Sequence, residues 1–147
     1  MFSILIPTYN NLDYLKTCID SIKKNSNLNY QIIIHINEGS DGTIEYVKDS
    51  RIDYTFSEVN IGMPKALNLA SKKAKYDYII ISHDDFYYCP GWDTAFAEEI
   101  NHIGHNNFYL SGTMVGEGQV KFEAGNNIKN FDEKKLLSNL KKIQTFN

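Results

Sequence analysis

"YIIISHDDFYYCPGW", residues 78–92, joins a short apolar run to two adjacent carboxylates and then to three aromatic side chains. The run has no polar residue before Ser82, which is typical of a strand that is buried on both faces of a parallel sheet. A buried strand that leads into Asp84 and Asp85 brings two negative charges to its carboxyl end. We therefore expect this end of the strand to carry out chemistry.

Strands and helices alternate along the chain that precedes this stretch. We predict strands over residues 2–7, 30–36, 51–57 and 76–82, and helices over residues 12–24, 43–49 and 60–75. Pro7 is expected to end the first strand, because proline cannot donate to a central ladder. Parallel strands joined by right-handed helical crossovers predict a doubly wound α/β domain with a mostly parallel sheet.

Four polar segments follow the four predicted strands. They are "PTYNN" (7–11), "NEGSDGT" (37–43), "SEVNIG" (57–62) and "HDDFYY" (83–88). Ligands of such sheets bind at the carboxyl ends of the strands, so the four segments are expected to form one site.

The C-terminal third has a weaker pattern. We predict a helix over residues 91–103, a strand over 108–115, a loop or hairpin over 116–127 and an amphipathic helix over 131–143. Four lysines of the last helix are interpreted as a solvated face rather than a binding patch: Lys134, Lys135, Lys141 and Lys142.

Composition sets the broad class. The chain has 147 residues, 42% of them hydrophobic, and a formal net charge of -3, as expected for one globular domain that has no basic surface for nucleic acid. Two distant cysteines, Cys18 and Cys89, favour a reduced, cytoplasmic location over a disulfide framework or a zinc site. The apolar run over residues 2–7 is too short for a transmembrane segment and has no basic leader.

The acid pair suggests a cation. Two ionised carboxylates repel each other unless a metal, a proton or a partner offsets their charge, and hard cations such as Mg²⁺ and Mn²⁺ prefer oxygen ligands. Adjacent residues of an extended segment point in opposite directions, so Asp84 and Asp85 are expected to have separate roles. The alternative is a turn or a helix cap, which Asp-Asp pairs often form.

These segments, in this order and spacing, resemble the family 2 glycosyltransferases, which have the Rossmann-like, three-layer GT-A fold. The resemblance covers about residues 2–115 and includes "FSILIPTYNNLDYLKTCIDSI", "NEGSDGT", "NIGMPKALN" and "HDDFYYCPGW". It implies a single GT-A domain over residues 1–147, with a donor-binding region over about 1–115. Residues 116–147 would then be a partial acceptor side or a terminal helix region.

The resemblance places the nucleobase at the first two loops. Pro7, Thr8, Tyr9 and Asn10 match the family's Pro-Thr-Tyr-Asn segment, and a tyrosine ring suits stacking on a base. Glu38 falls at the acidic position after the second strand, where a carboxylate accepts the N3 hydrogen of uracil and so favours a UDP-sugar. The loop departs from the usual pattern: it is one residue shorter, and Asn37 occupies a common aspartate position.

The resemblance places the rest of the donor at the last two loops. Lys65, near a helix N-terminus, is expected to meet the diphosphate. His83 stands at the first position of the usual Asp-x-Asp motif, and we expect Asp84 to face the ribose and Asp85 to bind Mn²⁺ or Mg²⁺. Phe86, Tyr87 and Tyr88 are expected to pack beneath the loop, and Trp92 to anchor it.

The implied reaction is transfer of a sugar from a nucleoside diphosphate to an acceptor hydroxyl, with inversion. The required general base is not identified, since Asp93, Glu117 and Glu123 match no family motif, and Asp93 is expected to be structural. The acceptor, whether glycan, lipid-linked or protein, is not identified either. Two other classes are a non-catalytic donor-binding module and a phosphoacceptor signalling domain, although the latter carries its acid pair after the first strand.

Overall fold

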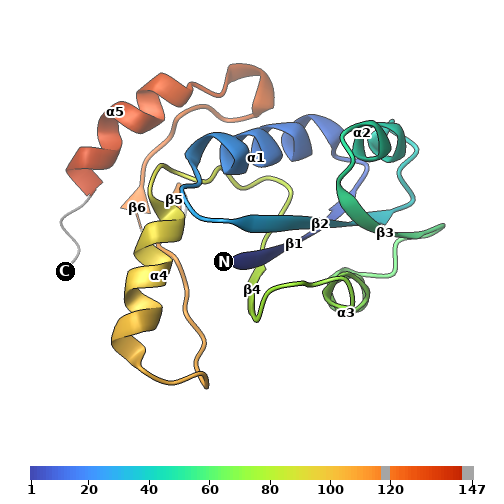
Figure 1. Ribbon diagram of the computed structural model, residues 1–147. Helices are drawn as coiled ribbons and strands as arrows, with labels where there is room; N and C mark the ends of the chain where they lie inside the picture. The colour runs from blue at the N-terminus through green and yellow to red at the C-terminus, as the bar shows by residue number, and fades with distance from the viewer. Residues whose placement is uncertain (117–119, 144–147) are drawn as a thin grey trace. The chain divides into compact units, whose positions relative to one another are not determined.

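The computed structural model describes residues 1–116 and 120–143, and the chain divides into two compact units, Met1–Thr94 and Ala95–Asn147. The first unit contains a parallel sheet of four strands, β1 (Phe2–Tyr9), β2 (Tyr30–Asn37), β3 (Asp53–Ser57) and β4 (Tyr78–Ile81) (Figure 1). The order across the sheet is β3-β2-β1-β4, so the two longest strands are central. This confirms the predicted α/β class and the parallel sheet.

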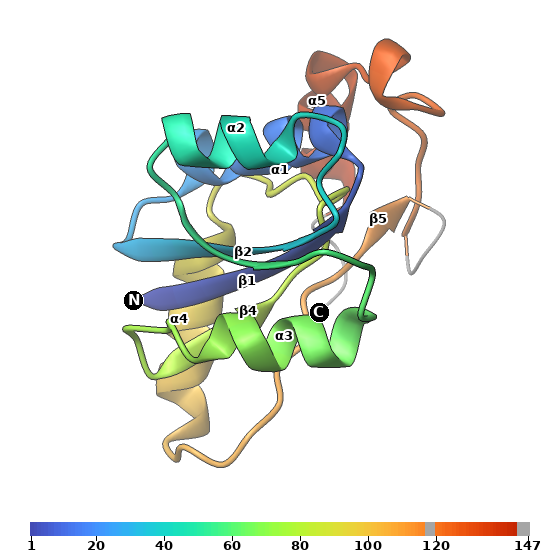
Figure 2. The same cartoon turned by 90° about the vertical axis from the view of Figure 1, so that its right-hand side faces the viewer.

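Three helices cover the two faces of this sheet. Figure 2 shows α1 (Leu12–Asn25) and α2 (Thr43–Asp49) on one face and α3 (Met63–Ser71) on the other. The apolar side of α1 buries Leu15, Ile19 and Ile22, which recur at three- and four-residue spacing. On the opposite face, Ala70 of α3 packs with Leu5 of β1 and Ile33 of β2. Helices on both faces explain why β1 and β2 are almost continuously apolar.

Pro7 does not end β1, contrary to the prediction. The strand continues to Tyr9, and Pro7 lies opposite His35 of β2. On the other side, β4 pairs with β1 only as far as Leu5, whose carbonyl accepts the Ser82 N–H at 2.9 Å. In a parallel ladder, residues two apart face the same neighbour, so Pro7 faces the side where β4 has already left the sheet. The missing N–H of proline therefore costs no ladder bond.

The second unit has less regular structure. It takes in most of α4 (Trp92–Ile103) and contains the short parallel pair β5 (Val115–Gly116) and β6 (Val120–Lys121). A 3-10 helix over Ile128–Asn130 begins with a capping box at Asn127, and α5 (Glu133–Ile143) follows. Along the described residues, no helix combines the length and the apolar character needed to cross a bilayer.

The predicted strand over residues 108–115 is wrong except at its last residue. Val115 begins β5, whereas residues 108–114 are irregular. An apolar sequence favours a strand, but a strand also needs a neighbour that satisfies its N–H and C=O groups. The expected loop or hairpin over 116–127 includes residues 117–119, which lie outside the described residues.

Candidate functional site

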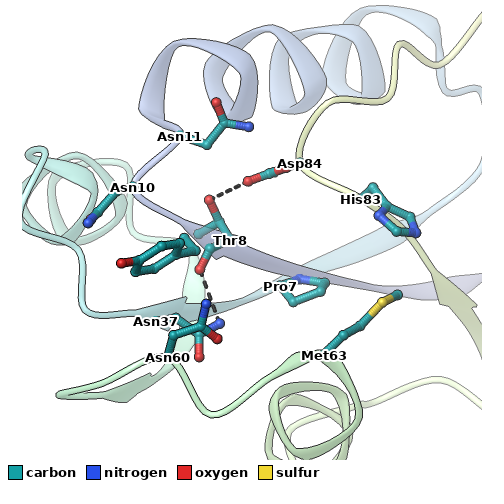
Figure 3. Close-up of a pocket in the computed structure, with 10 residues that line it drawn as sticks. Pro7, Thr8, Asn10, Asn11, Asn37, Asn60, Met63, His83 and Asp84 are labelled. Carbon is teal, nitrogen blue, oxygen red and sulfur yellow. Dashed lines mark hydrogen bonds between the residues drawn. The ribbon is translucent and has the colours of Figure 1, made fainter.

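A pocket of about 350 Å³ lies at the carboxyl ends of the strands in the first unit, a volume suited to a small-molecule ligand. Its lining comes from the ends of β1 and β2, from the loops that follow β1 and β3, from the first residue of α3 and from the segment that follows β4. The lining residues, shown in Figure 3, are Pro7, Thr8, Tyr9, Asn10, Asn11, Asn37, Asn60, Met63, His83 and Asp84. The predicted convergence of these segments on one edge of the sheet is therefore observed.

A hydrogen bond between Thr8 and Asp84 connects the end of β1 to the segment that follows β4. Thr8 is near the end of β1 and only 2% exposed, and its hydroxyl donates to Asp84 Oδ2 at 2.6 Å (Figure 3). The two residues are 76 positions apart in the sequence. Parallel pairing of β1 with β4 brings their carboxyl ends together, which explains how this contact forms.

Asn37, at the end of β2, connects β1 to the loop that follows β3. Its amide Nδ2 donates to the carbonyl oxygen of Thr8 at 3.2 Å. Its Oδ1 accepts the Ile61 N–H at 3.0 Å and the Ser57 hydroxyl at 3.4 Å. Asn37 is 4% exposed, and both ends of its amide are occupied, so it holds the loop after β3 against β1.

The loop after β1 is tied to the loop after β2 by two hydrogen bonds. The Ser40 N–H donates to Asn10 Oδ1 at 2.9 Å, and the Leu12 N–H donates to Asp41 Oδ2 at 2.8 Å. Burial raises the pKa of the Asp41 carboxyl, but hydrogen bonds from Thr43 and Leu12 outweigh burial and leave this pKa below its usual value. The ionised form of Asp41 therefore stabilises the two loops.

Tyr9 and Glu38 face each other across these loops. Tyr9 is 49% exposed, so its ring is accessible for stacking. The negative charge of Glu38, followed by a hydrogen bond to Glu38, raises the pKa of the Tyr9 hydroxyl. Glu38 Oε1 also accepts the Ser40 hydroxyl at 3.1 Å. The carboxylate is thus directed to Tyr9 and Ser40 and does not line the pocket.

The structure brings together part of the predicted site. Pro7, Thr8, Tyr9 and Asp84 line the pocket, whereas three other predicted residues do not: Glu38, Lys65 and Asp85. Lys65 is exposed in the first turn of α3, and Asp85 is exposed in the turn after Asp84.

Six lining residues are not among the residues assigned to the site from the sequence: Asn10, Asn11, Asn37, Asn60, Met63 and His83. All but Met63, the first residue of α3, belong to the predicted polar segments, so the rule that ligands bind at the carboxyl ends of strands was the signal for them.

The acidic residues of this edge suit a cation that shares its ligands with a substrate. Within the described residues, no group of three or more His, Cys, Asp or Glu side chains comes together as a metal cage. Mg²⁺ and similar ions commonly bind through one or two carboxylates and complete their shell with phosphate oxygens and water. Asp85 is exposed and Asp84 uses only Oδ2 for Thr8, so this donor set fits such an ion.

The segment after the acid pair is anchored to α1. Asn25 Nδ2 donates to the Tyr88 carbonyl at 2.7 Å and to the Tyr87 hydroxyl at 3.2 Å. The indole N–H of Trp92 donates to the Ser26 hydroxyl at 3.1 Å, and the Tyr88 and Trp92 rings pack edge to face at 4.8 Å. These contacts confirm the expected anchoring by Trp92.

Cys18 provides a further contact between α1 and the segment that follows β4. Its thiol donates to the His83 carbonyl at 3.5 Å. Burial, with a smaller effect of the Asp84 charge, raises the pKa of Cys18 to about 12. The thiol is therefore protonated at neutral pH and packs as a structural group.

Asp93 has a structural position, as expected. It is 1% exposed, and its Oδ2 accepts the backbone N–H groups of Asn27 at 2.5 Å and Leu28 at 2.6 Å. Its Oδ1 accepts the Thr94 N–H at 2.9 Å. Of the other two candidates, Glu123 is an exposed residue of the second unit, and Glu117 lies outside the described residues.

Sequence relatives of the chain are glycosyltransferases. An uncharacterized glycosyltransferase of Rickettsia typhi is 38% identical over 92 residues, which span 60% of this chain and 28% of that protein. Abequosyltransferase RfbV of Salmonella typhimurium is 32% identical over 107 residues, which span 67% of this chain and 30% of that protein. The matched regions thus cover less than a third of either relative.

Solved structures share the fold. Residues 1–349 of Staphylococcus aureus TarS align with a TM-score of 0.62 at 24% identity, over 69% of this chain and 32% of that one. TarS has also been solved in complex with UDP. The mannosyltransferase PcManGT of Pyrobaculum calidifontis, in complex with GDP-Man and Mn²⁺, aligns with a TM-score of 0.53 at 22% identity, over 64% of this chain and 30% of that one.

The family assignment rests on the length of the match as well as on the motifs. The model of the family described as "Glycosyl transferase family 2" matches residues 3–146, nearly the whole chain. The order of the sheet, the pocket at its carboxyl edge and the acidic turn after β4 are consistent with that match. The chain belongs to glycosyl transferase family 2.

Proposed function

We propose that this chain binds a nucleoside diphosphate sugar, a UDP-sugar by preference, together with a divalent cation, and transfers the sugar to an acceptor hydroxyl with inversion. The observation that carries the proposal is the pocket in which Asp84, held by Thr8, faces the loop of Tyr9. Family membership supports the reaction class. A cytoplasmic location remains part of the proposal and is based on the cysteine content.

The nucleoside would bind across the first two loops and the acidic turn. The half-exposed ring of Tyr9 can stack on the base, and Pro7 and Thr8 form the adjacent wall. Glu38 would turn from Tyr9 and Ser40 to accept the N3 hydrogen of uracil, and Asp84 would accept ribose hydroxyls through Oδ1. The UDP complex of TarS, a protein of the same fold, supports the choice of uridine.

The diphosphate would bind between α3 and the acidic turn. Asp85 would hold Mn²⁺ or Mg²⁺ together with phosphate oxygens, and Lys65 would approach the phosphates as a mobile point charge. Such a cation, when bound, neutralises the charge that develops on the departing diphosphate. The Mn²⁺ in the PcManGT complex supports this part of the proposal.

A second candidate is a donor-binding module that does not catalyse transfer, or the donor-binding part of a longer transferase. The observation that favours it is the engagement of Asp93 with backbone N–H groups, which leaves no assigned base among the described residues. Measurable transfer of sugar from a UDP-sugar to any acceptor would exclude the non-catalytic module.

Calorimetric titration with UDP, GDP and CDP, each with and without Mn²⁺, tests the binding proposal. We expect UDP to bind most tightly and Mn²⁺ to strengthen its binding. Asp85→Asn should remove the effect of Mn²⁺, whereas Asp77→Asn, a matched change at an exposed aspartate just before β4, should preserve it. Failure of all three nucleotides to bind would overturn the proposal, and a Mn²⁺ effect that survives in Asp85→Asn would remove Asp85 as the ligand.

A further inference from the structure

We infer that Thr8 and Asn37 are positioning residues, which orient Asp84 through hydrogen bonds that cross the carboxyl edge of the sheet. The connected groups follow the order of the strands: Asp84 after β4, Thr8 on β1, Asn37 on β2 and Ser57 at the end of β3. Figure 3 shows the two central bonds, from Thr8 to Asp84 and from Asn37 to Thr8. The effect on ligand affinity rests on the proposed function, but the orientation of Asp84 does not.

The hydroxyl of Thr8 is committed to Asp84. A hydroxyl has one proton to donate, and this one goes to Asp84 Oδ2 at 2.6 Å. Since Thr8 is 2% exposed, water cannot easily replace Asp84 as its partner. The bond selects one orientation of the carboxylate, in which Oδ1 is left for a ligand. Thr8 therefore acts on a nucleotide through Asp84 rather than by donating to it.

Asn37 must donate and accept at the same time. Its Nδ2 donates to the Thr8 carbonyl, while its Oδ1 accepts from Ile61 and Ser57. An aspartate of nearly the same shape could accept from Ile61, but its second oxygen would face the Thr8 carbonyl and repel it. Asn37→Asp therefore tests the connection with very little change in volume.

The far end of these hydrogen bonds is also held in place. The Ser57 hydroxyl shares its single proton between the Val59 carbonyl at 2.8 Å and Asn37 Oδ1 at 3.4 Å, and it lies 3.2 Å from Nε2 of the buried His35. A shift of Asn37 would therefore change both the loop after β3 and the backbone of Thr8. Both line the pocket, the loop through Asn60 and β1 through Thr8.

The test compares Thr8→Val, which keeps the shape and removes the hydroxyl, with Thr8→Ser, which keeps the hydroxyl. Calorimetry with UDP and Mn²⁺ should show about tenfold weaker binding for Thr8→Val, equivalent to about 1.4 kcal/mol. We expect the same loss for Asn37→Asp, and near-normal affinity for Thr8→Ser. Thr17→Val is the matched control, because the Thr17 hydroxyl donates to the Asp13 carbonyl of its own helix and Thr17 does not line the pocket.

A readout without ligand separates this inference from the proposed function. The side-chain ¹³C carboxyl signal of Asp84 should move in Thr8→Val and in Asn37→Asp, and stay in place in Thr8→Ser and Thr17→Val. An unmoved Asp84 signal in folded Thr8→Val would overturn the positioning role. If the unmodified chain fails to bind UDP while the Asp84 signal moves as expected, the proposed nucleotide is wrong and the positioning role is supported.

Discussion

Replacement of Asp93 by asparagine is expected to destabilise the fold rather than to act on the chemistry. The Asp93 carboxylate is buried and accepts three backbone N–H groups, from Asn27, Leu28 and Thr94. These bonds join the connection between α1 and β2 to the start of α4. The substitution changes little in volume, but it turns one of the two acceptor oxygens into an N–H₂ donor.

The size of the effect follows from the bonds that are lost. Whichever way the new amide turns, its N–H₂ group faces at least one backbone N–H that Asp93 now satisfies. A hydrogen bond to a charged group contributes about 1.5–3 kcal/mol, and a buried donor without a partner costs about 1–3 kcal/mol. We therefore expect Asp93→Asn to lower the free energy of unfolding by about 3 kcal/mol. That is a large part of the roughly 5–15 kcal/mol typical of a domain.

Urea unfolding monitored by Trp92 fluorescence measures this loss. With an m-value of about 1–3 kcal/mol/M, a loss of about 3 kcal/mol moves the midpoint down by about 1–3 M. Asp77→Asn, at an exposed aspartate, should leave the midpoint unchanged. A midpoint that does not move in Asp93→Asn would refute the structural role. Loss of sugar transfer at an unchanged midpoint would instead identify Asp93 as the base.

Two further predictions concern titratable groups. Glu38→Gln should lower the pKa of Tyr9 toward 10.0, because the charge and the hydrogen bond of Glu38 raise it; NMR titration of the Tyr9 ring measures this change. The same substitution should reduce the preference for UDP over CDP, which calorimetry measures. Burial lowers the pKa of His35 from 6.5, so as the pH falls the unfolded chain takes up a proton on His35 before the folded chain does. This proton uptake favours the unfolded chain, so the stability that is present above pH 6.5 is lost as the pH falls below it. His35→Gln should therefore flatten the decrease in urea midpoint below pH 6.5, and an unchanged slope would assign that decrease to other groups.

Most of the first unit could be predicted from local pattern. The strands and helices of Met1–Thr94 were found within a few residues, because apolar spacing indicates the type of each element. The expected burial of β4 on both faces is wrong, since Ile79 and Ile81 are 47% and 54% exposed. The rule for parallel sheets then placed the pocket at the correct edge, with Pro7, Thr8, Tyr9 and Asp84 in its lining.

The errors occurred where a neighbour decides the outcome. Pro7 was expected to end β1, but β4 had already left its side of the sheet, so proline was tolerated there. Residues 108–114 have the composition of a strand and form none, since composition does not supply a pairing partner. The composition of a segment thus indicates which secondary structure it can form, and its neighbours in the fold determine which one it adopts.

By itself, the sequence determined the α/β class, the edge of the sheet that holds the pocket, and the resemblance that the family match confirms. Only the tertiary structure decided which polar groups become partners. Thr8 meets Asp84 across 76 positions, and Asp93 meets Asn27 across 66. The physical reason is that apolar periodicity is a local property of the chain, whereas a hydrogen bond needs two groups within about 3 Å, and only the packed fold sets that distance.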